Sequence, residues 1–140
     1  MAGTAIEIED VTKRFLTPSG EVFTAIRDVT FTVEAGQFCA VVGPTGCGKS
    51  TTLSLVSGLD RPSAGTVSVG GTPVEGITDG VGFMFQADAL LPWKTVLQNV
   101  ALGLIFRRVP KKDALERARD WIRRVGLAGF EDRYPHQLSG

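Results

Sequence analysis

The sequence predicts an α/β fold: a core of strands and helices, with an antiparallel β subdomain before it and a helical subdomain after it. Two early segments alternate apolar and polar side chains, which is typical of strands with one exposed face. An uninterrupted apolar run at Phe38–Val42 leads into a glycine-rich turn and a helical pattern. Two more apolar helical stripes occupy the last third of the chain. This order indicates one α/β domain with two appended parts.

The composition is that of a single globular domain. At 140 residues the chain is too short for two well-built domains. Its 15 basic and 15 acidic residues balance, so no net field attracts nucleic acid or an anionic membrane. No apolar run approaches the roughly 18 residues of a spanning helix, and the N-terminus lacks a signal-peptide pattern. We expect a cytoplasmic protein with no nucleic-acid partner, in which Cys39 and Cys47 are buried thiols and not part of a disulfide framework.

The two alternating segments predict an antiparallel pair of strands. Ile6 and Ile8 share one side of the first segment, and Val29, Phe31 and Val33 share one side of the second. A Thr-Pro-Ser-Gly sequence between the segments predicts the turn that connects them.

The core is expected to contain a mostly parallel sheet. Phe38–Val42 is apolar on both faces, as in a strand buried inside such a sheet, and Val81–Phe85 is a second apolar run. In the helix between them, Leu53, Val56 and Leu59 repeat at three-residue spacing and define the expected core face. A buried strand without its neighbours exposes unpaired backbone groups, so we expect Phe38–Val42 to promote aggregation where the sheet is incomplete.

The remaining elements are one short strand and two helices. Glycines bound the strand, at Thr66–Val69. The apolar stripe of the first helix consists of Val96, Leu97, Val100 and Leu104. The second helix, opened by Pro110 and stopped by Gly126, has an apolar side made of Ala114, Leu115, Ala118, Trp121, Ile122 and Val125.

A phosphate-binding loop is the most specific motif in the chain. The pattern G-x-x-x-x-G-K-[ST] is matched in full by Gly43, Pro44, Thr45, Gly46, Cys47, Gly48, Lys49, Ser50 and Thr51. Glycines let several backbone N–H groups approach a triphosphate, and the helix that follows adds its own free N–H groups. Lys49 is expected to reach the β- and γ-phosphates, and Ser50 to hold Mg²⁺. The motif therefore predicts binding of a nucleoside triphosphate with Mg²⁺.

The loop alone does not name a function, because kinases, GTPases, helicases and transporters share it. The base-reading N-K-x-D of a GTPase is absent from the sequence, and the D-x-x-G match at Asp79–Gly82 precedes a predicted strand instead of following one. Cys47 has no histidine near it in sequence, which favours a small loop residue over a nucleophile.

Later segments carry a family resemblance. Val81–Gln86 ends in a glutamine, and Ala87–Trp93, Val96–Asn99 and Tyr134–Gly140 follow in that order. Behind a phosphate loop, this set resembles the ABC ATPase family over essentially the whole chain. The resemblance implies a P-loop NTPase core with an antiparallel β subdomain and an α-helical subdomain. The corresponding division of the chain is 1–90 and 91–140.

The resemblance also implies roles for single residues. Gln86 corresponds to the glutamine that touches Mg²⁺ and the attacking water, and Phe15 to an aromatic residue that stacks on adenine. Leu138, Ser139 and Gly140 correspond to the start of the LSGGQ signature, which closes on ATP held by a second, head-to-tail ATP-binding subunit. Each has an ordinary alternative: Gln86 as surface, Phe15 as core, and Leu-Ser-Gly as a common tripeptide.

Within the family, two segments look like the importers of nitrate, sulfonate and taurine. They are Leu90–Asn99 and Val125–Phe130. That likeness implies a transmembrane permease as partner, a periplasmic solute-binding protein as an indirect one, and a peripheral location on the inner face of the cell membrane. Trp93 is read either as ordinary packing or as an anchor at the permease interface.

Three family elements do not occur in these 140 residues: the rest of the signature, the strand ending in an Asp-Glu pair, and the switch histidine. His136 is the chain's one histidine and precedes the signature. Without the two carboxylates the Mg²⁺ and the attacking water lose their partners, so we expect no ATP hydrolysis. We interpret the chain as truncated within the signature, with the C-terminal part of the core sheet absent.

Two other functions compete with an importer subunit. The first is a soluble ABC protein that uses ATP as a clamp on nucleic acid or ribosomes. The second is a small-molecule kinase, for which the basic stretch Arg107–Arg124 would serve as an arginine lid. That stretch has eight basic residues against three acidic ones, and a solvated helix face is its ordinary interpretation.

Overall fold

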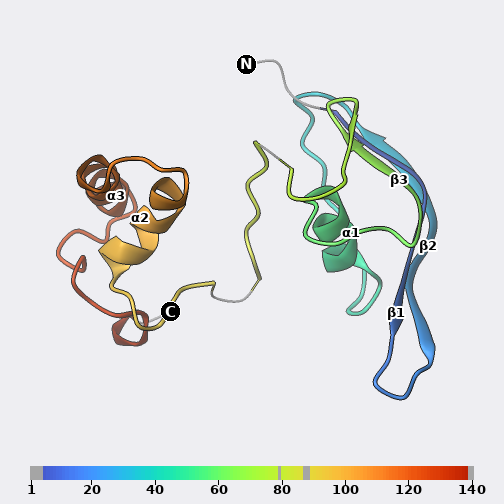
Figure 1. The fold of residues 1–140 in the computed structure, drawn as a ribbon, viewed down its shortest axis with the longest axis horizontal. Coiled ribbons are helices and arrows are strands. Elements are labelled where there is room, and N and C mark those ends of the chain that lie inside the picture. The colour runs from blue at the N-terminus through green and yellow to red at the C-terminus, as the bar shows by residue number, and fades with distance from the viewer. Residues whose placement is uncertain (1–4, 79, 87–88, 139–140) are drawn as a thin grey trace. The chain divides into compact units, whose positions relative to one another are not determined.

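A computed structural model describes residues 5–78, 80–86 and 89–138 and divides the chain into two compact units (Figure 1). The N-terminal unit spans Met1–Met84 and the C-terminal unit Phe85–Gly140. The division into functional parts at 1–90 and 91–140 stays a prediction. No helix in the described ranges has both the length and the apolar character needed to cross a membrane.

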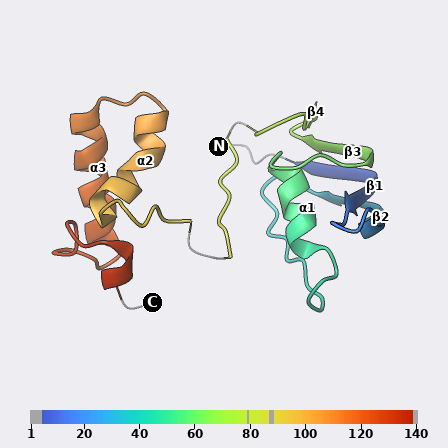
Figure 2. The ribbon, with the colours of Figure 1, turned by 60° about the horizontal axis from the view of Figure 1, so that its bottom comes forward.

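The N-terminal unit contains a four-stranded antiparallel sheet. It consists of β1 (Ile6–Leu16), β2 (Val22–Val33), β3 (Ala64–Val69) and β4 (Thr72–Pro73), in the order β2-β1-β3-β4. The predicted pair of strands is confirmed as the β1–β2 hairpin, and the strand expected near Thr66 is confirmed as β3 (Figures 1 and 2).

A bulge in β1 sets which of its side chains are buried. Ile8 and Val11 are both buried although strict alternation places them on opposite faces. The register with β2 shifts between these two residues, where Asp10 has a left-handed φ of 47°. Its N–H donates to the Thr30 hydroxyl oxygen at 2.9 Å instead of to the β ladder. The extra residue returns Val11 to the core face, as bulges do.

Helix α1 (Lys49–Val56) packs against one face of this sheet (Figure 2). Leu55 is its fully buried side chain and joins a core made of Ile8, Val11, Ile26 and Val67. The predicted core face was wrong in part, because Leu53 and Leu59 are about half exposed whereas Val56 does pack against the core. Three-residue spacing drifts around a helix of 3.6 residues per turn, and Leu59 lies beyond the helix end.

The predicted central strands are not formed in the described residues. Residues 38–42 follow β2 as a loop, with Phe38 92% and Val42 87% exposed, and 81–85 lie outside any strand. A strand needs a neighbour for its backbone groups, and the strands of the observed sheet pair only with one another. The burial predicted for Cys39 and Cys47 was also wrong: both thiols are exposed, Cys39 in this loop and Cys47 in the turn before α1.

The C-terminal unit is a helical pair. It contains α2 (Val96–Phe106), α3 (Lys111–Arg124) and the 3₁₀ turn η1 (Pro135–Gln137). Both predicted helices are confirmed, and so is the stop at Gly126, which has a left-handed φ of 78°.

The buried faces of α2 and α3 are narrower than the apolar stripes in the sequence. Their shared core consists of Val96, Leu97, Ala101, Ala118 and Ile122. Val100, Trp121 and Val125 were assigned to apolar stripes but are exposed. Small alanines at the contact let the two helices approach closely, which leaves the larger residues at its rim outside.

Candidate nucleotide-binding site

Gly48 joins the phosphate loop to strand β2. Its φ of 94° is left-handed, a conformation that suits glycine. A Cβ at this position would lie 2.2 Å from Cγ2 of Ile26 and 2.9 Å from the carbonyl oxygen of Ala25. Glycine is therefore required twice over, for backbone conformation and for close approach to the sheet.

The N-terminus of α1 keeps free donors for an anion. Gly48 is the N-cap residue, no side chain caps it, and the first turn contains no acidic residue. The helical ladder starts with the Thr52 N–H, which donates to the Gly48 carbonyl at 2.9 Å. The N–H groups of the first turn, from Lys49 to Thr51, have no partner inside the helix and carry its positive partial charge. Such an end is suited to bind phosphate.

The Lys49 ammonium lies within the curve of the loop. It donates to the carbonyl oxygens of Gly43 at 2.9 Å and Pro44 at 2.7 Å. The Cys47 sulfur is 3.7 Å away. These contacts hold the side chain back on the loop, so a triphosphate in the loop meets a cation already in place.

A pocket of about 250 Å³ joins this loop to the β1–β2 hairpin. The loop and helix contribute Gly46, Gly48, Lys49, Ser50 and Thr51, and the hairpin contributes Phe15, Phe23 and Ala25. Phe15 and Phe23 are directly opposite each other in the β1–β2 pair. Phe15 is 40% exposed, which does not fit the interpretation of this side chain as core. One pocket therefore offers aromatic surface at the hairpin and N–H donors at the helix.

The other predicted site residues are not part of this pocket. Gln86 is exposed and belongs to the C-terminal unit. Leu138 packs, partly buried, against the α2–α3 core. Ser139 and Gly140 lie outside the described residues.

The residues at the loop fit a phosphate-bound Mg²⁺. The described part of the chain holds no group of three or more His, Cys, Asp or Glu side chains suited to bind a metal ion. Mg²⁺ needs no such cage, because it binds through one or two protein oxygens together with substrate phosphates and water. Ser50, which lines the pocket, is such an oxygen donor.

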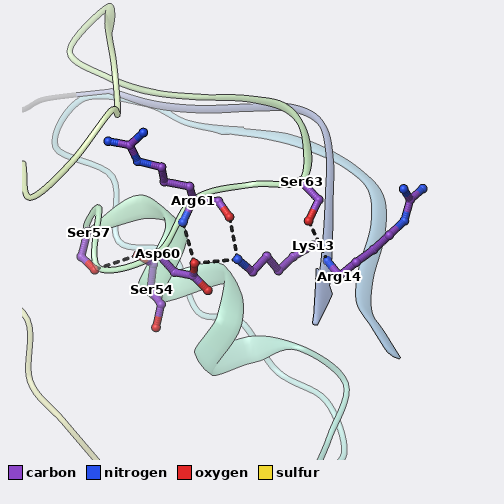
Figure 3. A network of polar contacts seen from close by, with 7 residues as sticks. All are labelled: Lys13, Arg14, Ser54, Ser57, Asp60, Arg61 and Ser63. Atoms are coloured by element: carbon purple, nitrogen blue, oxygen red, sulfur yellow. Dashed lines mark hydrogen bonds and ion pairs between the residues drawn. The ribbon is translucent and has the colours of Figure 1, made fainter. Parts of the chain in front are cut away.

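A polar network behind Phe15 was not found from the sequence (Figure 3). Lys13 Nζ donates to Asp60 Oδ1 at 2.6 Å and to the Arg61 carbonyl oxygen at 2.8 Å. The same ammonium lies 4.9 Å from the centre of the Phe15 ring. The hydrogen bond from Lys13 is the largest cause that lowers the pKa of the Asp60 carboxyl below its ordinary value of 3.8. Nothing in the sequence pattern connects residues 13 and 60.

In the C-terminal unit, the Asn99 side chain organises the loop that precedes α2. The Asn99 side chain donates to the carbonyl oxygens of Leu91, Lys94 and Thr95 at 3.0–3.1 Å, and its Oδ1 accepts from the Leu91 N–H at 2.9 Å. Trp93 lies on this loop and is 69% exposed, so it does not pack in the core. Asn99 thus holds a loop whose tryptophan faces solvent.

Comparisons with known proteins agree on one family. The family profile described as ABC transporter matches residues 26–140. An uncharacterized ABC transporter ATP-binding protein, MJ0412 of Methanocaldococcus jannaschii, is 42% identical over 135 residues, covering 96% of this chain and 50% of that protein. The taurine import ATP-binding protein TauB of Burkholderia pseudomallei is 45% identical over 117 residues, covering 84% and 45%. The nitrate import ATP-binding protein NrtD of Synechocystis is 39% identical, covering 96% and 50%.

Solved structures of ATP-binding cassettes are also similar to this chain. The ATP-binding cassette MJ0796, in a dimeric post-hydrolysis state bound to ADP and Pi, superimposes with a TM-score of 0.82 at 30% identity. The match covers 96% of this chain and 63% of that one. The chain spans about half the length of the curated relatives that it matches.

Proposed function

This chain belongs to the ABC transporter family, and we propose that it is the ATP-binding, energy-coupling part of an importer for a small oxyanion such as nitrate, sulfonate or taurine. Its fold is that of the ABC ATPase cassettes, and its relatives include import ATP-binding proteins for taurine, sulfate and nitrate. The pocket that unites the phosphate loop with Phe15 is the observation that supports ATP binding, and the similarity to import ATP-binding proteins supports the importer.

ATP is the proposed ligand of that pocket. Its triphosphate lies against the free N–H groups at the start of α1 and the Lys49 ammonium, and its base stacks on Phe15 at the hairpin. Mg²⁺, when bound, neutralises phosphate charge, and Ser50 is its proposed protein ligand in this pocket. A role of Gln86 at the metal stays a prediction from the family resemblance. Aromatic stacking and backbone donors complement the two chemically different ends of the nucleotide.

Replacement of Lys49 tests this assignment. Lys49→Ala removes a charge-assisted contact to the β- and γ-phosphates, which is worth roughly 1.5–3 kcal/mol. The dissociation constant of a non-hydrolysable ATP analogue is measured by equilibrium titration. Lys112→Ala, at an exposed position of α3, is the matched control and leaves affinity unchanged. Equal affinity in parent and Lys49→Ala would refute the role of Lys49.

Binding without turnover is the proposed activity of residues 1–140 by themselves. Gln86 is the catalytic residue that we propose within residues 1–140, where its role is to orient the attacking water. The Asp-Glu pair and the switch histidine of the family do not occur in this sequence. Positioned carboxylates and metal supply most of the catalysis in phosphoryl transfer, so the nucleotide is held but not cleaved.

Two protein partners complete the proposal. A membrane permease docks on Ala87–Trp93, of which residues 87 and 88 lie outside the described residues. The exposed Trp93 is the anchor, and Asn99 holds the loop around it in place. A second ATP-binding subunit meets Leu138–Gly140 head to tail across its own ATP, and a periplasmic solute-binding protein acts indirectly. This assembly places the protein on the cytoplasmic face of the membrane.

Cross-linking tests the docking surface. We expect a cysteine at Trp93 to form efficient disulfide cross-links with cysteines in the cytoplasmic loops of a membrane permease that co-purifies with this chain. A cysteine at the exposed Trp121 of α3 is the matched control. Cross-links at position 121 together with none at 93 contradict the proposed surface.

A further inference from the structure

We propose that Lys13 is a positioning residue that sets the orientation of the Phe15 ring for the nucleotide base. This inference rests on the proposed function, since it concerns the base-binding end of the same pocket. Lys13 itself is not among the residues that line the pocket. It acts through Phe15, whose ring lies 4.9 Å from the ammonium.

The ammonium of Lys13 is held by hydrogen bonds to Asp60 and Arg61. Its side chain is 12% exposed, and two of its three N–H donors are used by Asp60 Oδ1 and the Arg61 carbonyl oxygen. The Asp60 carboxylate is itself anchored, because its Oδ1 also accepts from the Arg61 N–H at 2.7 Å. A lysine held in this way is a fixed charge instead of a mobile surface cation.

A fixed cation restricts the ring that it faces. Phe15 lies near the exposed end of the hairpin, where an aromatic side chain has several staggered rotamers open to it. A cation over one face of a ring is attracted by the ring's π-electron density, which favours the rotamer that keeps this contact. Lys13 covers part of the ring surface, and the rest remains for the pocket. The nucleotide therefore meets a ring whose conformational freedom is already reduced.

The same network connects the two ends of the pocket through α1. The N-terminus of α1 forms the phosphate end, and the loop after α1 carries Asp60 (Figure 3). That loop is tied to the helix by the Asp60 N–H, which donates to the Ser54 carbonyl at 3.2 Å. It is tied to β1 by the Ser63 N–H, which donates to the Thr12 carbonyl at 2.8 Å. One helix thus supports the phosphate donors directly and the base ring through Lys13.

The test separates base recognition from phosphate binding. Lys13→Met keeps the aliphatic stem but removes the cation. In the full 140-residue chain, dissociation constants are measured for Mg²⁺–ATP and for Mg²⁺–tripolyphosphate, which has no base. We expect ATP to bind about threefold to tenfold more weakly and tripolyphosphate to bind as before, since a cation–π contact of this kind is modest. Lys13→Arg keeps the cation and restores most of the ATP affinity, and Lys111→Met, on α3, is the matched control.

Each outcome of this experiment supports or overturns the positioning role of Lys13 or contradicts the proposed function. Unchanged ATP affinity in Lys13→Met, or an equal loss for ATP and tripolyphosphate, overturns the positioning role. If Lys13→Met does not give a folded chain by thermal melting, Asp60→Ala carries the test, because it removes the side-chain acceptor of Lys13 and leaves the cation, and it must show the same selective loss. A parent chain that binds neither ligand in a Lys49-dependent way contradicts the proposed function instead.

Discussion

The β1–β2 hairpin and the segment at residues 38–42 are both rich in residues that favour strands, yet only the hairpin is a sheet. Strand β2 begins at Val22, shortly after β1 ends at Leu16, so each strand finds its partner locally. The segment at 38–42 pairs with no strand among the described residues and is exposed. An apolar run therefore predicts burial only where a neighbouring strand is also present, whereas an alternating pair with a turn supplies its own neighbour.

The core behind the hairpin gives the largest expected effect. Leu55→Ala removes a fully buried side chain from the contact between α1 and the sheet and costs about 2–5 kcal/mol of unfolding free energy. Leu53→Ala, on the same helix but 51% exposed, is the matched control and changes stability by less than about 0.5 kcal/mol. Urea denaturation measures both. Equal losses at the two positions contradict the assigned core face of α1.

The second test of this comparison concerns the exposed segment at residues 38–42. Phe38→Ser with Val42→Ser changes the unfolding free energy of the 140-residue chain by less than about 0.5 kcal/mol, because neither side chain is packed. It also lowers aggregation, measured by light scattering, since an exposed apolar run is removed. A chimera that joins residues 1–138 to the remaining half of the Methanocaldococcus relative sharpens the contrast. There the same changes cost about 1–3 kcal/mol if the added strands bury the segment. No cost in the folded chimera contradicts that expectation.

The smallest expected effect is a pH dependence of stability that arises from the Lys13–Asp60 ion pair. The pKa of Asp60 is lowered, first by the hydrogen bond from Lys13, so folding favours the ionised carboxylate. This contribution to stability is present above pH 3.8, the ordinary value, and is lost as the pH falls through the lowered pKa. The melting temperature of the parent chain is compared with that of Asp60→Asn between about pH 2 and 6. The variant lacks this part of the acid dependence, and parallel curves for the two proteins would show that the pair adds nothing.

The sequence carried the local features of this protein. The hairpin and both helices of the C-terminal unit follow from short-range patterns, and the structure contains all of them. Phosphate binding by the glycine-rich loop stays a prediction. Phe15 was named from the family resemblance, and its partner Phe23 was missed. Register counting from the turn finds it, since Leu16 pairs with Val22 and Phe15 with Phe23.

Features that depend on distant contacts were harder to predict. The pair of Lys13 and Asp60 joins residues 47 positions apart, and no periodicity in the sequence records it. The buried face of α1 is set by where the sheet lies, so Leu55 is buried although the apolar spacing favoured Leu53. The strand expected at 38–42 depended on neighbours that the described residues do not supply.

Because Gly48 contacts Ile26 closely, strand β2 connects the phosphate end of the pocket to its base end. The contact fixes the phosphate loop to the strand at residue 26, and the same strand carries Phe23 at the base end of the pocket. Residues 23 and 26 lie on one strand, with a register irregularity between them, so the backbone of β2 links the two ends of the pocket. A deletion of one residue between these positions would bring the two ends of the pocket closer together and would also turn Phe23 to the opposite face of the sheet.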